Sequence, residues 1–136
     1  MDQAVIKYYR QILSEGFRFV GTVDNPTIVL DAVGENVRIC DHVGTDSLQM
    51  FIKVKDDTIS DIKYMCMCDP TTNVAVEILC RLALGKPLAS LASITPESFS
   101  TVLGGGDEDL HKKAKGLMEL VHIGLERFKT ASISTQ

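Results

Sequence analysis

The clearest pattern in the chain is an alternation of apolar residues with other residues in two stretches, 48–54 and 62–68. Such alternation is typical of β-strands that bury one face. The turn-forming residues 55–58 (KDDT) lie between the two stretches, so we predict an antiparallel hairpin with one apolar face. Helices are needed to cover that face. The residues assigned to it are Leu48, Met50, Ile52, Val54, Ile62, Tyr64, Cys66 and Cys68.

Apolar residues at helical spacing predict helices on both sides of this hairpin. The first helix spans about residues 3–14 and ends at Gly16. The second begins at Asp69-Pro70, because Asp caps exposed backbone N–H groups and Pro suits the first helical position, and it runs to about Leu84. Its polar stripe is Asn73, Glu77 and Arg81, in which Glu77 and Arg81 are spaced to form an ion pair.

Two more helices are predicted in the second half of the chain. A short one begins at Thr95-Pro96 and ends at the glycines 104–106. A long one follows the acidic residues 107–109 and extends to about Lys129, with a frayed polar tail from Thr130. Its apolar stripe, the residues expected to face the core, comprises Leu110, Ala114, Leu117, Met118, Val121, Leu125 and Phe128.

The stretch 17–43 has shorter β-rich runs broken by turn residues, and Val37–Cys40 is the best candidate strand in it. The order helix, strands, helices indicates the α+β class, with an antiparallel sheet of three or more strands and the helices packed on one face. At 136 residues the chain is expected to form a single domain over residues 1–136.

Composition narrows the range of partners. The chain has 14 Lys and Arg against 18 Asp and Glu, a net charge of −4, which argues against binding nucleic acid or an anionic membrane surface. No apolar run approaches the ~20 residues of a membrane span. The first residues lack the basic and apolar regions of a signal peptide. We therefore expect a cytoplasmic protein whose four cysteines are thiols or metal ligands rather than disulfides.

From residue 44 to the last helix, the order of landmarks resembles the iron–sulfur cluster assembly scaffold family, the IscU proteins and the N-terminal domain of NifU. Residues 44–46 (GTD) fall where that family has Cys-Gly-Asp, and residues 67–70 (MCDP) where it has Gly-Cys-Gly. The resemblance covers about two-thirds of the chain and is weak before Val43. The remaining matching landmarks are Ile59–Tyr64, Gly85-Lys86, Ile94–Glu97, Leu103–Gly105 and His111-Lys112.

The resemblance implies an α+β scaffold in which three cysteines hold a transient cluster beside an Asp and sometimes a His. The three cysteine positions correspond here to Gly44, Asp69 and Lys112, and none is a cysteine. Asp46 and His111 are retained. Cys68 is displaced by one residue from the family's cysteine position, and a shift of one residue in a strand places the side chain on the opposite face of the sheet. The cluster-site residues implied are Gly44, Asp46, Asp69, His111 and Lys112.

The resemblance therefore suggests a non-enzymatic scaffold-like protein with a degenerate cluster site. If a metal binds, its candidate ligands are Asp46, Cys68, Asp69 and His111, a set that favours zinc over an iron–sulfur cluster. The partners implied are a cysteine desulfurase and iron–sulfur acceptor proteins.

Each candidate residue also has a simpler interpretation. Asp69 is a helix cap, Asp46 a turn residue, His111 a boundary residue and Lys112 a solvated side chain. Cys66, Cys68 and Cys80 are packed thiols.

Two alternatives to a cluster scaffold remain open. The first is a cluster-free interaction module with the same fold; the apolar helix over 70–84 motivates it, because a second subunit would complete burial of that helix in a homo-oligomer. The second is an enzyme that uses Cys66 or Cys68 as a thiol nucleophile.

Overall fold

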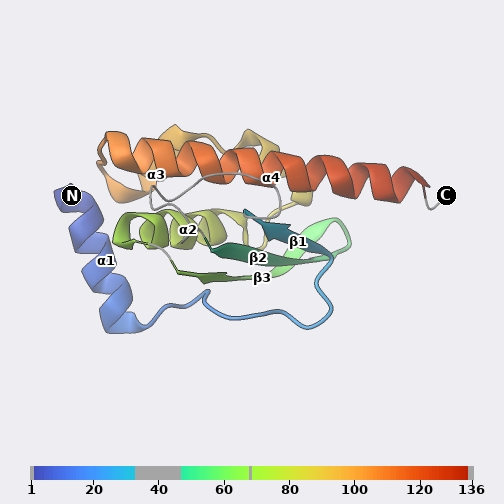
Figure 1. Cartoon of the computed structure of the whole chain (residues 1–136), viewed down its shortest axis with the longest axis horizontal. Helices are drawn as coiled ribbons and strands as arrows, with labels where there is room; N and C mark the ends of the chain where they lie inside the picture. The colour runs from blue at the N-terminus through green and yellow to red at the C-terminus, as the bar shows by residue number, and fades with distance from the viewer. Residues whose placement is uncertain (1, 33–46, 68, 135–136) are drawn as a thin grey trace.

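The computed structural model describes residues 2–32, 47–67 and 69–134, and the side chains of the last helix as far as Lys129. The predicted strand at Val37–Cys40 lies outside these residues. The elements follow one another in the order shown in Figure 1: α1 (Gln3–Glu15), β1 (Ile28–Asp31), β2 (Leu48–Lys55), β3 (Thr58–Cys66), α2 (Pro70–Ala83), a 3₁₀ helix η1 (Leu88–Ser93), α3 (Pro96–Leu103) and α4 (Glu108–Ser134).

The described strands form an antiparallel three-stranded sheet in the order β1-β2-β3, which confirms the predicted α+β class. The hairpin β2–β3 has the predicted register, in which inward residues pair with inward residues, as Ile52 does with Ile62 and Met50 with Tyr64. Their side chains are buried, whereas Gln49, Lys53 and Met65 on the other face are exposed. The alternation in the sequence therefore corresponds to the two faces of the sheet, with the apolar residues on the buried face.

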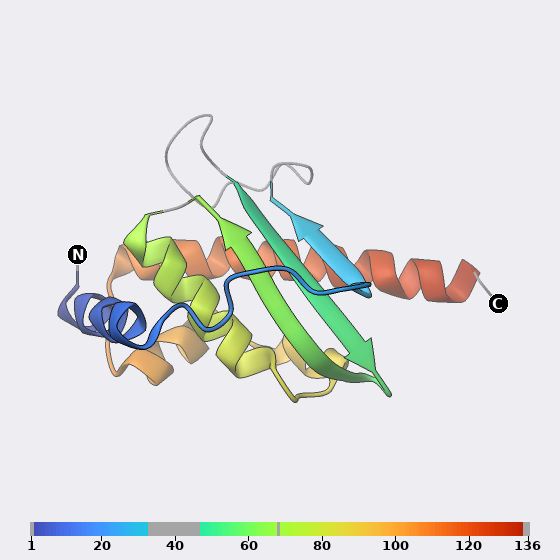
Figure 2. The same cartoon turned by 90° about the horizontal axis from the view of Figure 1, so that it is seen from below.

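The helices α2, α3 and α4 lie on one side of the sheet, and α4 crosses the strands obliquely and packs against β1 (Figures 1 and 2). The segment between α1 and β1 pairs with the edge of β3, where the Tyr64 N–H donates to the Phe19 carbonyl and the Gly21 N–H to the Tyr64 carbonyl. It then passes along the opposite face of the sheet to reach β1 (Figures 1 and 2). One continuous apolar core joins the sheet to these helices.

The predicted helix boundaries agree with the structure where local chemistry sets them. α1 ends at Gly16, whose φ of 88° favours glycine, and α3 ends at Gly104 in the left-handed conformation. Asp69 caps α2 as predicted. Asp107 caps α4 by accepting the Leu110 N–H at 3.0 Å, and α4 continues to Ser134, past the predicted end at Lys129.

Two elements were not predicted from the sequence. β1 lies at Ile28–Asp31, although its inward residues Ile28 and Leu30 and outward Val29 do alternate. η1 supplies Leu88 and Leu91 to the core between α2 and α3. Both segments are too short for periodicity to distinguish them from loops.

α2 is buried within one chain, which removes the reason for proposing a second subunit. Its apolar side chains pack against α1, α4 and β3, and Val74, Val76 and Ile78 have no exposed surface. The helix looked too apolar for one domain because it is surrounded by other elements of the same chain.

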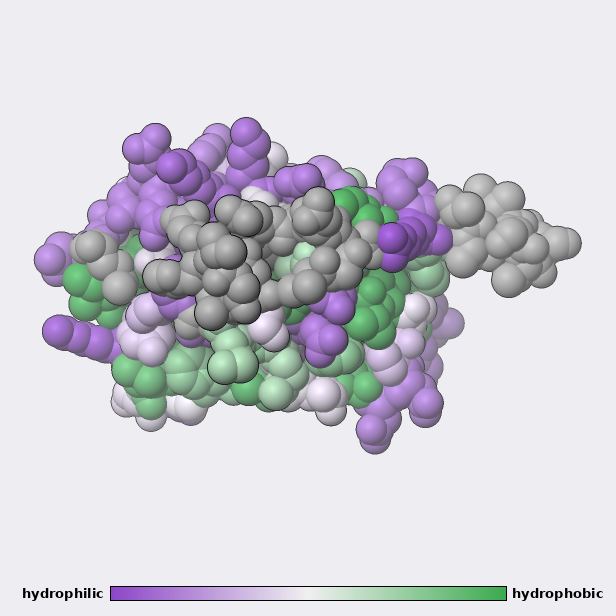
Figure 3. Space-filling model, in the orientation of Figure 1, coloured by the Kyte–Doolittle hydropathy of each residue, from purple (hydrophilic) through white to green (hydrophobic). Residues whose placement is uncertain are grey.

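The surface differs between the two sides of the molecule. Hydrophilic residues cover most of the side formed by α4, and hydrophobic residues reach the surface mainly on the side of the sheet (Figure 3). Among the described residues, no helix is both long enough and apolar enough to span a membrane.

Candidate functional site

The first residue of the candidate site is Asp69, which lies between the end of β3 and the start of α2. Its Oδ1 atom accepts the backbone N–H of Thr72 at 2.8 Å, and its carbonyl accepts the N–H of Asn73. A capping carboxylate satisfies N–H groups that have no partner within the helix and lies at the positive end of the helix dipole. The first turn of α2 therefore fixes the position of Asp69.

The second residue is Lys113, in the second turn of α4, which the sequence reasoning missed. Its side chain is 2% exposed, and its Nζ lies 3.5 Å from Asp69 Oδ2 and 4.0 Å from Asp109 Oδ1. A lysine is rarely buried unless it is paired. The ion pair with Asp69 therefore joins the N-terminal ends of α2 and α4, and it places an ammonium group beside the capping carboxylate.

The surroundings of Asp69 keep it ionised. Partial burial by itself would raise the pKa of its carboxyl, but the hydrogen bonds from Thr72 and the Lys113 ammonium outweigh burial and lower the pKa below its ordinary value. Both carboxylate oxygens are engaged, Oδ1 by Thr72 and Oδ2 by Lys113.

The other candidates implied by the resemblance are placed differently. His111 and Lys112 are exposed on α4. Successive helical residues are about 100° apart, so His111 lies about 200° around the helix from the buried Lys113. Hydrogen bonds from its own backbone and from the Thr95 side chain lower the pKa of the exposed Glu97, and nearby His111 adds to this shift. Gly44, Asp46 and Cys68 lie outside the described residues.

The geometry around Asp69 fits a metal ion poorly. Within residues 2–32, 47–67 and 69–134, no three His, Cys, Asp or Glu side chains are grouped so that they could hold one. A cation approaching Asp69 would have to displace the Lys113 ammonium from Oδ2. Like charges in a partly buried site repel one another strongly, because the local dielectric constant is lower than that of water.

Comparison with known proteins identifies the fold. No family model and no curated protein matches the sequence. The structure is similar to that of a nitrogen-fixing NifU-like protein (N-terminal) from Brucella abortus, with a TM-score of 0.62, 9% identity, and coverage of 95% of this chain and 94% of that one. This chain has the NifU-like scaffold fold.

A second solved structure supports the same conclusion. It is a protein assigned as an iron–sulfur cluster assembly scaffold for the SUF system of Fervidobacterium islandicum AW-1, with a TM-score of 0.58 and 14% identity over 92% of this chain and 96% of that one. At such low identity the similarity establishes the fold alone. The chemistry of the site must be argued from the residues of this chain.

The described cysteines do not provide a reactive thiol. Cys66 is disulfide-bonded to a cysteine outside the described residues, which contradicts the expectation of a free thiol. A disulfide-bonded sulfur cannot act as a nucleophile, so Cys66 is not a nucleophile in this structure. Cys80, the free cysteine of the described part, is fully buried in α2. Burial raises the pKa of its thiol well above the usual range, as does the nearby Glu77 carboxylate, so the reactive thiolate is disfavoured.

A second polar group missed by the sequence reasoning is Glu77. The predicted ion pair with Arg81 is absent from the described contacts, because Arg81 donates to the Tyr8 hydroxyl at 3.1 Å instead. Glu77 is only 4% exposed and accepts backbone N–H groups of Phe19 and Arg18. Burial raises the pKa of its carboxyl despite these bonds. The sequence signal was a single Glu in a largely apolar helix.

Proposed function

We propose that this protein acts in iron–sulfur cluster assembly as a scaffold-like binding protein that does not itself carry a cluster. The fold, which is that of NifU-like and SUF scaffold proteins, supports the link to cluster assembly. The observation that carries the cluster-free part is the buried ammonium of Lys113, 3.5 Å from Asp69. The function rests on binding to other proteins and involves no catalysis.

The argument for a cluster-free site is electrostatic. Iron–sulfur clusters are held by thiolates, whose negative charge offsets that of the iron ions. At this site a carboxylate stands beside a lysine, and the two neutralise each other without a metal. A partly exposed carboxylate paired in this way keeps the ends of α2 and α4 together.

The partners proposed are a cysteine desulfurase and iron–sulfur acceptor proteins. A protein that keeps the scaffold fold without a cluster can still occupy the scaffold's place on such a partner, and thereby regulate access to it. A divalent metal such as zinc, bound through Asp46, Cys68 or Asp69, and His111, is the competing proposal. The exposed position of His111, about 200° around α4 from Lys113, argues against it.

Metal analysis tests the cluster-free proposal. The protein is purified without oxygen, incubated with ferrous iron and sulfide or with zinc, desalted, and assayed for iron, acid-labile sulfide and zinc. We expect far less than one equivalent of each. One equivalent of zinc, or of iron with matching sulfide, that is lost in Asp69→Ala and retained in the exposed-site control Lys112→Ala would overturn it.

Binding measurements test the link to cluster assembly. The purified protein is titrated, by calorimetry, against the cysteine desulfurase encoded in the same genome, with and without EDTA. We expect saturable binding that the chelator does not change, because no metal bridges the partners. Absence of binding to the desulfurase and to acceptor proteins would overturn this part of the proposal, whatever the metal analysis shows.

A further inference from the structure

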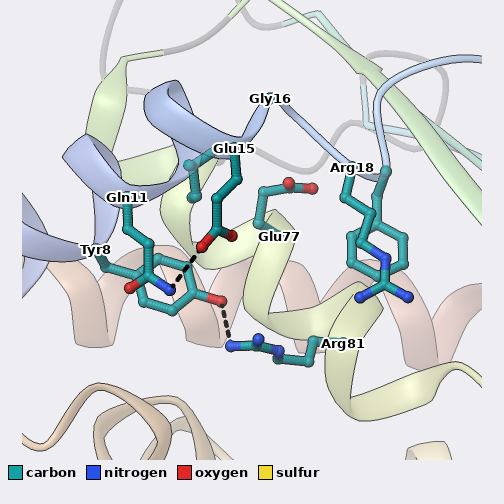
Figure 4. A pocket seen from close by; sticks show the side chains of 9 residues that line it. Tyr8, Gln11, Glu15, Gly16, Arg18, Glu77 and Arg81 are labelled. Atoms are coloured by element: carbon teal, nitrogen blue, oxygen red, sulfur yellow. Dashed lines mark hydrogen bonds between the residues drawn. The ribbon is translucent and has the colours of Figure 1, made fainter.

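A small pocket lies where α1, the turn that follows it and α2 meet (Figure 4). Its volume is about 60 Å³, enough for a small polar molecule. None of its lining residues belongs to the Asp69–Lys113 pair. The charged and polar side chains around it are Tyr8, Gln11, Glu15, Arg18, Glu77 and Arg81.

Glu77 forms the buried part of this pocket. It projects from α2 toward the turn Gly16–Arg18 (Figure 4) and accepts backbone N–H groups from that turn. The buried hydroxyl of Tyr64 lies within reach of the Glu77 carboxylate, but neither it nor Glu77 Oε2 makes a hydrogen bond of good geometry among the described residues. Glu77 forms no ion pair among the described residues; burial raises the pKa of its carboxyl, and the charge of nearby Lys63, which donates to the Arg18 carbonyl, offsets only part of this rise. A buried carboxylate whose charge is only partly compensated is costly, so a ligand that brings a positive charge would be stabilised.

The two arginines of the pocket are held by aromatic rings rather than by carboxylates. Arg81 lies over the Tyr8 ring at 5.9 Å and donates one N–H to its hydroxyl. Arg18 lies over the Phe19 ring at 5.6 Å. In the described structure neither makes an ion pair with Glu77 or Glu15, and each guanidinium has five N–H donors, so most of these donors remain for a ligand.

Two carboxylates and two guanidiniums thus surround one small space without neutralising each other in pairs. Figure 4 shows Glu15 and Glu77 in the upper part of the site, Arg18 at the right, and Arg81 below with its guanidinium beside the Tyr8 hydroxyl. A simple anion would be repelled by the carboxylates, and a simple amine would be repelled by the arginines. A molecule with both charges a few ångströms apart satisfies all four groups.

We propose that this pocket binds a small zwitterion of the α-amino acid class. The ammonium group lies against the Glu77 carboxylate, and the carboxylate accepts N–H groups of Arg81 and Arg18. Glu15, whose Oε1 accepts from Gln11 at 3.3 Å, adds negative charge on the ammonium side. This site is independent of the cluster-assembly role, and one proposal can fail while the other stands.

Titration of the whole protein followed by amide NMR tests the site. The probes are glycine and L-alanine, with ethylammonium and propionate as analogues that carry only one of the two charges. We expect saturable shifts at residues 8–19 and 77–81 with the amino acids, and binding of either analogue about tenfold weaker or less, because each analogue loses charge-assisted hydrogen bonds.

Variants assign the binding to the pocket. Arg81→Met removes an exposed guanidinium and Glu77→Gln removes the buried charge, and each is expected to weaken amino acid binding about tenfold. Arg10→Met, an exposed change on α1 outside the pocket, is the matched control and should bind as the parent does. The proposal is overturned by absence of saturable shifts with either amino acid, by equal binding of the single-charge analogues, or by unchanged binding in Arg81→Met.

Discussion

Replacement of Lys113 by methionine tests whether the Asp69–Lys113 pair is structurally important. Methionine keeps most of the apolar volume of the lysine stem and removes the ammonium group that lies 3.5 Å from Asp69. Lys112→Met makes the same chemical change one residue earlier, at an exposed position. The difference between the two variants therefore isolates the buried charge from any general effect of losing a lysine on α4.

The expected magnitude follows from burial. Breaking a fully buried ion pair costs about 3–5 kcal/mol, because the remaining charge is stranded. The Asp69 side chain is 29% exposed, so water partly compensates the lost partner, and we expect Lys113→Met to cost about 1–2 kcal/mol. That corresponds to a fall in Tm of roughly 3–8 °C for a domain of this size. Lys112→Met should change stability by less than about 0.5 kcal/mol.

Urea unfolding at pH 7, monitored by circular dichroism, measures both variants against the parent. NMR titration of the carboxyl supplies a second readout, since loss of the Lys113 charge should raise the pKa of Asp69. In the double variant Asp69→Asn with Lys113→Met, the two costs should not add, because each removes the same interaction. Equal stabilities for the Lys113 and Lys112 variants, with an unchanged Asp69 pKa, would refute the reasoning.

Three further predictions concern stability. Gly124→Ala should destabilise the protein by about 1–2 kcal/mol despite the better helix propensity of Ala, because the added Cβ would meet Leu30 of β1. The control Glu119→Ala, at an exposed position of α4, should not destabilise it, and thermal melts of the two variants measure the difference. Asp69→Asn keeps a capping residue but loses the charge. Because the pKa of Asp69 is lowered in the folded state, its charge stabilises the protein above about pH 4, and this stabilisation is lost as the pH falls through the lowered pKa. The Tm of the variant should therefore approach that of the parent at pH 3, and a Tm difference that stays constant with pH would contradict the assignment. Burial raises the pKa of Glu77 in the folded state, so its contribution to stability is present below about pH 4.3 and is lost as the pH rises through the raised pKa. Glu77→Gln should therefore gain stability relative to the parent between pH 4 and 7. A Tm difference between the two proteins that does not change across this range would disprove the prediction.

Local chemistry made several features of the fold predictable. The alternation over 48–54 and 62–68 required a strand pair with one buried face, whatever covered that face. Gly16, Asp69 and Gly104 mark helix ends because their conformations or side chains suit those positions alone. These signals act over a few residues, so they can be read without knowledge of the rest of the molecule.

The candidate site was predictable only in part. Asp69 was recognised as a cap, but Lys113 was not distinguished from the exposed Lys112 beside it, because a shift of one residue moves a side chain by about 100° around a helix. Its place opposite Asp69 depends on how α4 packs beside α2. Likewise, Glu77 and Arg81 have the spacing of a helical pair, yet Tyr8 of α1 binds Arg81 and the turn after α1 binds Glu77.

The sequence by itself determined that the chain builds a one-faced antiparallel hairpin, an apolar capped helix after it and a long amphipathic helix, because hydrophobic periodicity and capping act locally. Tertiary structure alone decided which charged side chains are buried and what each of them contacts. Lys113 carries no mark of burial in the sequence, and the apolar residues around Glu77 in α2 do not show what its carboxylate contacts. The reason is physical: the pairing of a buried charge depends on groups that lie far along the chain and meet it only when the helices pack.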